Sequence, residues 1–184
     1  PLARGEWIKL YAALLNEEEK ANELFSEQTA HLDALSDNAS TNKTVAFFHI
    51  SSSGFVVARK SGDYVSKMIE LAGGKYVFEN LGDPDKDTST VTVEMETFYE
   101  IAKDADFIIY NSTIGGEIKT MEEFLSLSGL LKNFKAVKTG NVWCTSENMF
   151  QESLQLGRMI GDFNAIFTDN TENINGVRYL HKLK

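Results

Sequence analysis

Apolar residues recur every three or four positions through the first 35 residues of the chain. In residues 2–15 (LARGEWIKLYAALL) this spacing gathers the apolar side chains on one helical stripe. Three glutamates at 17–19 begin a second run of the same period, and the helix dipole favours negative charge in a first turn. The pattern predicts two consecutive helices with a bend near Asn16. The stripe of the first helix consists of Ala3, Trp7, Leu10, Tyr11 and Leu14.

Short β-branched and aromatic runs alternate with helical patterns from residue 44 onward. The runs predict strands at 44–50, 75–78, 107–110 and 142–144. Helical patterns occupy 61–72, 93–105, parts of 117–134, and 153–167. The region with the least predicted structure is 80–90. Such alternation is typical of βαβ units with right-handed crossovers. We therefore predict an α/β fold in which helices cover both faces of a mostly parallel sheet, a three-layer αβα lobe.

Hydroxyl and amide side chains follow three of the predicted strands at the point where each strand ends. Ligands of open parallel sheets bind outside the carboxyl ends of the strands, which share one edge. We therefore expect the three loops to line a cleft for a polar ligand. The same residue types also cap helices and form turns, and this alternative stays open. The expected ligand-binding residues are Ser51, Ser52, Ser53 and Phe55 in the first loop, Tyr110, Asn111, Ser112 and Thr113 in the second, and Thr145, Ser146, Met149 and Gln151 in the third.

One arginine and several aromatic residues add to this expected site. Arg59 lies near the sheet edge just before a helix, where a guanidinium can clamp a carboxylate or another anion. A solvated or salt-bridged arginine is the equally weighted alternative. Phe55, Tyr110, Trp143 and Phe150 can supply flat apolar contacts, although core packing is the favoured interpretation for Trp143.

Composition and charge exclude several classes of function. The chain has 184 residues, enough for one α/β domain with helical additions, and a net charge of −9, which argues against a nucleic-acid partner. Cys144 is the only cysteine, so neither an internal disulfide nor a metal site built from several thiolates is expected. No run of 18 apolar residues is present, and we expect no membrane-spanning segment.

Candidate catalytic chemistry is sparse. SSSGF lacks the lysine of a phosphate-binding P-loop, and the two Gly-Gly pairs lack dinucleotide-binding spacing. The three histidines, His31, His49 and His181, show no metal-ligand spacing, so we expect no metal and no cofactor. An enzyme on a flavodoxin-like sheet, handling a small polar metabolite, remains the alternative hypothesis. It would need a general base, for which His49 or Glu147 is the candidate.

Four residue runs resemble one protein family in their order and spacing. They are PLARGEWIKLYAALLNEEEKANELF, GDYVSKMIELAGGKYVFENLG, METFYEIAKDADFIIYNST and FKAVKTGNVWCTS. Together they cover nearly the whole chain, which resembles the carboxyl-terminal half of the ABC-transporter solute-binding proteins for ferric siderophores, haem and cobalamin. No single run is diagnostic, but the order and spacing of a long helix, a helix ending in Ala-Gly-Gly, a helix–strand unit and a turn–strand unit are fairly specific to this family.

The resemblance implies a division of the chain and a function. Residues 1–16 correspond to the interlobe helix and 17–184 to the carboxyl-terminal α/β lobe, with the amino-terminal lobe absent. The implied protein is not an enzyme. It is the exported component of an importer, periplasmic or lipid-anchored at the cell surface, which binds an iron chelate, haem or cobalamin between two lobes. An exposed apolar face on helix 2–15 would be the physical sign of the missing lobe, and it would also allow the chain to form a homodimer.

The resemblance also implies a docking site for the membrane permease. Each lobe in the family carries a surface glutamate that contacts arginines of the permease. By its position ahead of a helix, Glu96 is the expected residue, with Glu94 as the alternative. Either glutamate can instead serve only as negative charge at a helix N-terminus.

Overall fold

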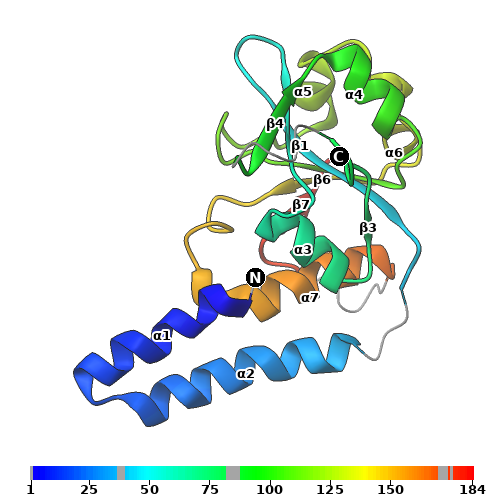
Figure 1. Cartoon of the computed structure of the whole chain (residues 1–184). Helices are drawn as coiled ribbons and strands as arrows, with labels where there is room; N and C mark the ends of the chain where they lie inside the picture. The colour runs from blue at the N-terminus through cyan, green and yellow to red at the C-terminus, as the bar shows by residue number, and fades with distance from the viewer. Residues whose placement is uncertain (1, 37–39, 82–87, 170–173, 175) are drawn as a thin grey trace.

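A mixed sheet forms the centre of the computed structural model, which describes residues 2–36, 40–81, 88–169, 174 and 176–184 (Figure 1). The strands are β1 (Thr44–Ile50), β2 (Val56–Arg59), β3 (Lys75–Tyr76), β4 (Thr90–Val93), β5 (Phe107–Tyr110), β6 (Val142–Thr145) and β7 (Leu180–Lys182). Within the described residues they follow the order β4-β2-β1-β5-β6-β7, with β3 also paired to β1. The pairs β1–β3, β1–β5 and β5–β6 are parallel, as predicted for the centre of the sheet.

Helices cover both faces of this sheet, which confirms the predicted three-layer α/β fold (Figure 1). The helices are α1 (Leu2–Leu15), α2 (Glu18–Ser36), α3 (Tyr64–Leu71), α4 (Met95–Ala102), α5 (Met121–Ser126), α6 (Lys135–Lys138) and α7 (Leu156–Phe167), with 3₁₀ turns η1 (Leu131–Asn133) and η2 (Ser153–Gln155). On one face, Phe48 of β1 packs against Phe98 of α4 and Phe124 of α5. On the other, Phe107 of β5 contacts Phe167 of α7 edge to face. The core therefore has an aromatic layer on each side of the strands.

The first two helices form an antiparallel hairpin along one side of the molecule (Figure 1). The bend predicted near Asn16 is a full reversal, and Asn16 takes a positive φ of 56° between the two helices. Asparagine tolerates this left-handed conformation better than most residues with a side chain. Helix α2 packs on α7, so the hairpin is attached to the lobe mainly through its second helix. Trp7 and Leu14 of α1 stay 59% and 73% exposed, as expected for the predicted stripe.

Three strands with antiparallel partners, two of them at the edges of the sheet, were absent from the prediction. β2 returns from β1 through a tight turn in which the Ser51 amide donates to the Phe55 carbonyl at 2.8 Å, and Gly54 takes a φ of 84°. β4 pairs with β2, so the predicted helix at 93–105 is corrected to a strand ending at Val93 followed by α4. β7, in the basic tail, pairs with β6. Residues 82–87, within the 80–90 region for which the sequence predicts the least structure, lie outside the described residues.

Candidate functional site

A hollow of about 550 Å³ lies at the carboxyl edge of the parallel strands. It is formed by the loops that follow β5 and β6, together with the end of β2. Its lining residues are Arg59, Ser112, Thr113, Ile114, Gly116, Glu117, Glu147, Phe150 and Gln151. Five of these, Arg59, Ser112, Thr113, Phe150 and Gln151, come from the sequence-predicted set.

The loop after β5 is held by a network of buried polar side chains. The Ser112 amide donates to the Thr145 hydroxyl at 3.0 Å, and the Ser112 hydroxyl donates to the Thr145 carbonyl. Asn111 accepts from the Thr113 hydroxyl at 2.7 Å through its side-chain oxygen. Asn111 and Thr145 are almost completely buried, at 1% and 0% exposure. These two side chains therefore join the loops after β5 and β6 to one another, and their expected ligand contact stays a prediction.

Tyr110 is also directed into the protein. Its hydroxyl accepts from the Ile50 amide at 3.3 Å, and its ring packs edge to face on Phe48 and Phe124. Burial raises the pKa of the Tyr110 phenol, with the Ile50 amide acting in the opposite direction. The ring therefore links the ends of β1 and β5 from inside the core.

The loop after β6 turns back on itself before it reaches the hollow. The Ser146 amide donates to the Tyr179 carbonyl at 2.9 Å, and the Met149 amide donates to the Ser146 carbonyl at 3.1 Å. Met149 is 2% exposed and belongs to the core, whereas Gln151 is exposed and lines the hollow. The turn thus buries one of the predicted residues and presents another.

The loop after β1 is a hairpin turn and contributes no lining to the hollow among the described residues. The Ser51 hydroxyl accepts from the Phe55 amide at 3.2 Å, which uses the side chain to close the turn. Ser52 and Ser53 are exposed, and Phe55 is 39% exposed. The three loops leave the same edge of the sheet, as their parallel strands require, but only the second and third enclose the hollow.

Arg59 lines the hollow next to the aromatic ring of Phe150. Its guanidinium lies 3.5 Å from the carboxylate of Asp63, the N-cap of α3, and 5.9 Å from the ring centre of Phe150. Asp63 also accepts from the Val65 amide at 2.9 Å, which fixes the carboxylate at the helix start. Arg59 therefore has an ion-pair partner, which was one of the two sequence-based alternatives, and it also lines the hollow. Its contact with an anionic ligand stays a prediction.

Three lining residues were missed by the sequence interpretation: Ile114, Gly116 and Glu117. Ile114 is 62% exposed, and its position directly before a Gly-Gly pair was the signal available in the sequence. Gly116 has a φ of 97°, which suits a residue without a side chain. The placement of these three residues depends on how the 111–116 loop turns, which no periodicity encodes. Glu147 was named from the sequence only as a candidate general base, and it also lines the hollow.

The geometry gives little support to covalent catalysis. Burial, with a smaller contribution from Glu117, raises the pKa of the Cys144 thiol to about 12, so the thiolate is scarce at neutral pH. Burial and the charge of Arg59 lower the pKa of His49, but His49 does not line the hollow. Among the described residues, no group of three or more His, Cys, Asp or Glu side chains is arranged to hold a metal ion.

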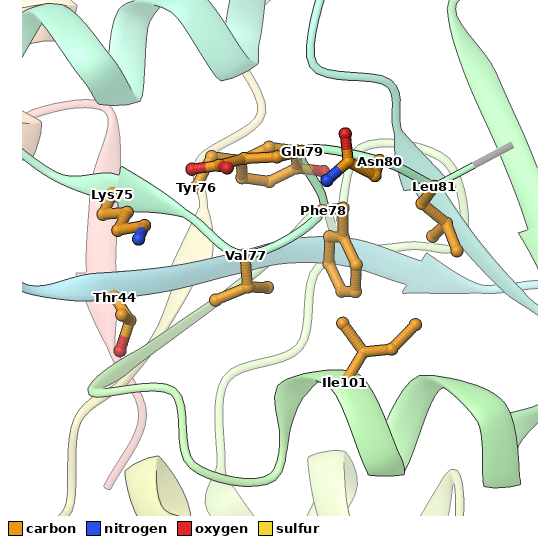
Figure 2. A pocket seen from close by; sticks show the side chains of 9 residues that line it. All are labelled: Thr44, Lys75, Tyr76, Val77, Phe78, Glu79, Asn80, Leu81 and Ile101. Atoms are coloured by element: carbon orange, nitrogen blue, oxygen red, sulfur yellow. The ribbon is translucent and has the colours of Figure 1, made fainter. Parts of the chain in front are cut away.

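A second hollow, of about 430 Å³, lies near the first residue of β1 and away from the loops described above (Figure 2). Phe78, in the segment after β3, points toward Ile101 of α4, and Val77 lies over β1 (Figure 2). Lys75, Glu79 and Asn80 supply charged and amide side chains to its lining, and Thr44 and Tyr76 supply hydroxyl-bearing ones.

The two glutamates predicted for permease docking lie at the beginning of α4. Glu94 is the N-cap residue and Glu96 is in the first turn, and both are exposed. Neither side chain caps the helix by a hydrogen bond to its backbone among the described contacts. Both carboxylates are therefore accessible on the surface.

Comparison with known proteins gives this fold a family. The family model described as periplasmic binding protein matches residues 3–148. The chain belongs to the periplasmic binding protein family. The uncharacterized lipoprotein MJ0878 of Methanocaldococcus jannaschii is 30% identical over 156 residues, which are 84% of this chain and 36% of that protein. A second uncharacterized lipoprotein of that organism, MJ0872, is 31% identical over 81% of this chain and 38% of its own length. The binding protein thus spans well under half the length of these curated relatives.

Solved structures share the fold of this binding protein at low sequence identity. A periplasmic haem-binding protein, RhuT from Roseiflexus, superposes with a TM-score of 0.70 at 16% identity, over 90% of this chain and 62% of that one. An ABC transporter substrate-binding protein from Listeria monocytogenes gives a TM-score of 0.67 at 21% identity, over 90% and 64%. The chain therefore shares the fold of a part of such proteins. No helix in the described ranges is long and apolar enough to cross a membrane.

Proposed function

We propose that this chain is the carboxyl-terminal lobe and interlobe helix of the solute-binding component of an ABC importer. Its ligand would be an iron chelate, haem or cobalamin, held between this lobe and an amino-terminal one. The observation that carries the proposal is the hollow at the carboxyl edge of β5 and β6, lined by Arg59, Phe150 and hydrogen-bonding side chains. Binding without catalysis agrees with the buried thiol of Cys144 and with the family of the chain.

The exposed stripe of α1 supports a second lobe. Trp7, Leu10, Tyr11 and Leu14 are each more than half exposed, and contiguous apolar surface of this kind marks an interface. Relatives two to three times the length of the matched region contain enough chain to supply the covering lobe. A homodimer, in which a second copy of this chain would bury the α1 stripe, is not supported by the comparisons.

Delivery to a membrane permease and export to the cell surface are part of the same proposal. Glu96, or Glu94 beside it, would contact arginines of the permease from the exposed start of α4. The lipoprotein names of MJ0878 and MJ0872 support a lipid-anchored, exported location. Replacement of Glu96 by Arg is expected to abolish ligand uptake by cells while leaving ligand binding unchanged. Normal uptake by the Glu94→Arg, Glu96→Arg double variant would contradict this docking site.

The binding proposal is tested by titration of the complete gene product. Ferric hydroxamates, ferric catecholates, haemin and cyanocobalamin are each added while tryptophan fluorescence is followed. We expect saturable quenching by at least one of them, weakened roughly tenfold by Phe150→Ala, because loss of an aromatic contact costs about 1–2 kcal/mol. Lys138→Ala, on the exposed side of α6 and away from the hollow, is the control and should leave binding unchanged. Absence of quenching by all four ligand classes would contradict the proposal.

A further inference from the structure

The charged side chains that line the hollow carry a net negative charge. Arg59 is the only cation among its lining residues, and its guanidinium already lies 3.5 Å from the Asp63 carboxylate. Asp63 is buried, with 5% of its side chain exposed, and stays beside Arg59 as the N-cap of α3. The positive charge of Arg59 is therefore largely matched before a ligand arrives.

Two carboxylates line the same hollow. Glu117 lies 3.5 Å from Lys119 and 3.8 Å from His181, so it has partners at the edge of the site. Glu147 is exposed on the hollow and makes no ion pair or side-chain hydrogen bond within the described part of the chain. The remaining lining side chains are uncharged. They are Ser112, Thr113, Ile114, Phe150 and Gln151, with Gly116 supplying backbone.

This arrangement discriminates between ligands by charge. An anionic ligand needs several cationic or amide donors directed at it, and carboxylates in the same cleft repel it. Ferric tris-catecholates are trianions, and haem has two propionates, so both present negative charge to Glu147. A neutral or cationic ligand meets hydroxyl, amide and apolar contacts in this hollow without repulsion, and a positive group on it gains an unpaired carboxylate partner.

We infer that the ligand is neutral or positively charged, and that Glu147 contacts a cationic or hydrogen-donating group on it. The inference rests on the proposed function and narrows its ligand class: ferric hydroxamates and cobalamin-like corrinoids fit, whereas ferric tris-catecholates and haem do not. Glu147 acts as the specificity-determining residue, because it is the lining carboxylate without a partner among the described residues.

The test compares ferric chelates that differ in charge, two of which share one chelating chemistry. Three probes are titrated into the complete gene product: a neutral ferric trihydroxamate, a ferric trihydroxamate with a protonated primary amine, and a trianionic ferric tris-catecholate. We expect the two hydroxamates to bind at least about tenfold more tightly than the catecholate. The Glu147→Gln variant should bind the amine-bearing chelate about five- to tenfold more weakly and the neutral chelate as tightly as before. Glu122→Gln, an exposed carboxylate in the first turn of α5, should change neither affinity.

The outcomes separate this inference from the function on which it rests. Tightest binding of the catecholate, or an equal effect of Glu147→Gln on the neutral and the amine-bearing chelates, overturns the charge preference and leaves an importer component in place. Failure of haemin, corrinoid and all three chelates to bind a protein that is folded by circular dichroism overturns the proposed function, and the inference with it. If Glu147→Gln weakens binding of the amine-bearing chelate and leaves binding of the neutral chelate unchanged, the result supports both the charge preference and the proposed function.

Discussion

Tyr76 closes a gap in the sheet where β1 changes its partner. Along one edge β1 pairs with β3 at Thr44 and Val45, and then with β2 from Phe48 onward. Between the two ladders, the Tyr76 hydroxyl donates to the Arg59 carbonyl at 2.7 Å and lies 3.4 Å from the Phe47 carbonyl. The side chain therefore satisfies backbone groups that no strand reaches, and it fixes the end of β2 that carries Arg59.

Replacement of Tyr76 by Phe is expected to destabilise the protein by about 1–2 kcal/mol. The change removes the buried donor and leaves the Arg59 carbonyl without it, while keeping the ring that packs on Phe78. Denaturant unfolding followed by circular dichroism measures the loss. Tyr11→Phe, at a hydroxyl on the exposed face of α1, serves as the matched control, and an equal loss in both variants would contradict the role of the Tyr76 hydroxyl.

Cys144 is expected to be unreactive in the native protein. Burial raises its pKa to about 12, so at pH 8 its thiolate fraction is roughly three orders of magnitude below that of a free cysteine. A chromogenic disulfide reagent should label the folded protein very slowly, and the protein in guanidinium at the rate of a free thiol. Stoichiometric labelling of the folded protein within minutes would show that the thiol is accessible.

Residue types alone did not separate the side chains that face the hollow from those that bind the loops together. Asn111 and Thr145 carry the same groups as Thr113 and Gln151, but the first two are buried between β5 and β6. The difference arises from the register of these strands and the turns after them, which depends on contacts between residues more than 30 positions apart. The sequence therefore predicted the edge of the sheet and five lining residues, and not the direction of each side chain.

At the scale of elements, strands buried on both faces were the predictable ones. β1, β5 and β6 are continuous apolar runs, and their existence and parallel order follow from that pattern and from the helices between them. β2, β4 and β7 are three or four residues long; β4 and β7 lie at the edges of the sheet, and β2 lies between β1 and β4. Their pairing is decided by turns such as 51–55. The strands themselves are too short for an alternating hydrophobic pattern to identify them.

An ion pair between Asp106 and Lys135 links helix α6 to the beginning of strands β1 and β5. Asp106, just before β5, accepts from the Thr44 amide and hydroxyl, both at 2.9 Å, and from Lys135 of α6 at 2.7 Å. Burial alone would raise the pKa of Asp106, but the bonds from Lys135 and Thr44 outweigh it and lower the pKa. Because the pKa of Asp106 is lower in the folded than in the unfolded protein, the carboxylate stabilises the fold at pH values above the unfolded pKa of about 3.9. This contribution is lost as the pH falls through the folded pKa.

The Asp106→Asn variant should therefore lose stability at neutral pH and much less in acid. We expect a loss of about 1–2 kcal/mol at pH 7, because Lys135 is half exposed and its charge is screened. The difference from the native protein should shrink toward pH 3, where the native carboxyl becomes protonated. Urea unfolding at both pH values measures it, with the exposed Asp104→Asn as control. A difference that is constant with pH would show that the carboxylate charge is not involved.

At the scale of the whole molecule, the α1 stripe makes almost no contribution to the fold of this chain. Leu10 and Leu14 are 51% and 73% exposed, and α1 contacts the lobe chiefly through α2 and η2. The Leu10→Ser, Leu14→Ser double variant of this chain should change the free energy of unfolding by less than about 0.5 kcal/mol per site. It should also bind less of a dye that reports exposed apolar surface. A large loss of stability would show that the stripe is packed within the lobe.

The loop after β6 meets the segment before β7 at Glu152. Its carboxylate accepts from the Tyr179 hydroxyl, from Arg178 at 2.8 Å and from Asn148 at 3.2 Å. Asp162 of α7 accepts from the Arg178 and Tyr179 amides, both at 2.8 Å, and so holds the same tail from the other side. The pKa of Glu152 is lowered, mainly by the hydrogen bond from the Tyr179 hydroxyl. The segment before β7 is thus fastened to the loop that carries Glu147 and Gln151.

Because the folded pKa of Glu152 is lowered, its stabilising effect is present above the unfolded value of about 4.3 and disappears as the pH falls through the folded pKa. The Glu152→Gln variant should have a lower thermal midpoint than the native protein at pH 7, and the two midpoints should converge toward pH 3. Glu122→Gln, an exposed carboxylate with no such partners among the described contacts, should not change the midpoint at either pH. Hydrogen exchange then localises the effect: Glu152→Gln should speed exchange in 146–151 and in β7 and leave β1 protected. Equal acceleration throughout the sheet would mean that Glu152 supports the fold as a whole, and that the rim of the hollow is held by other contacts.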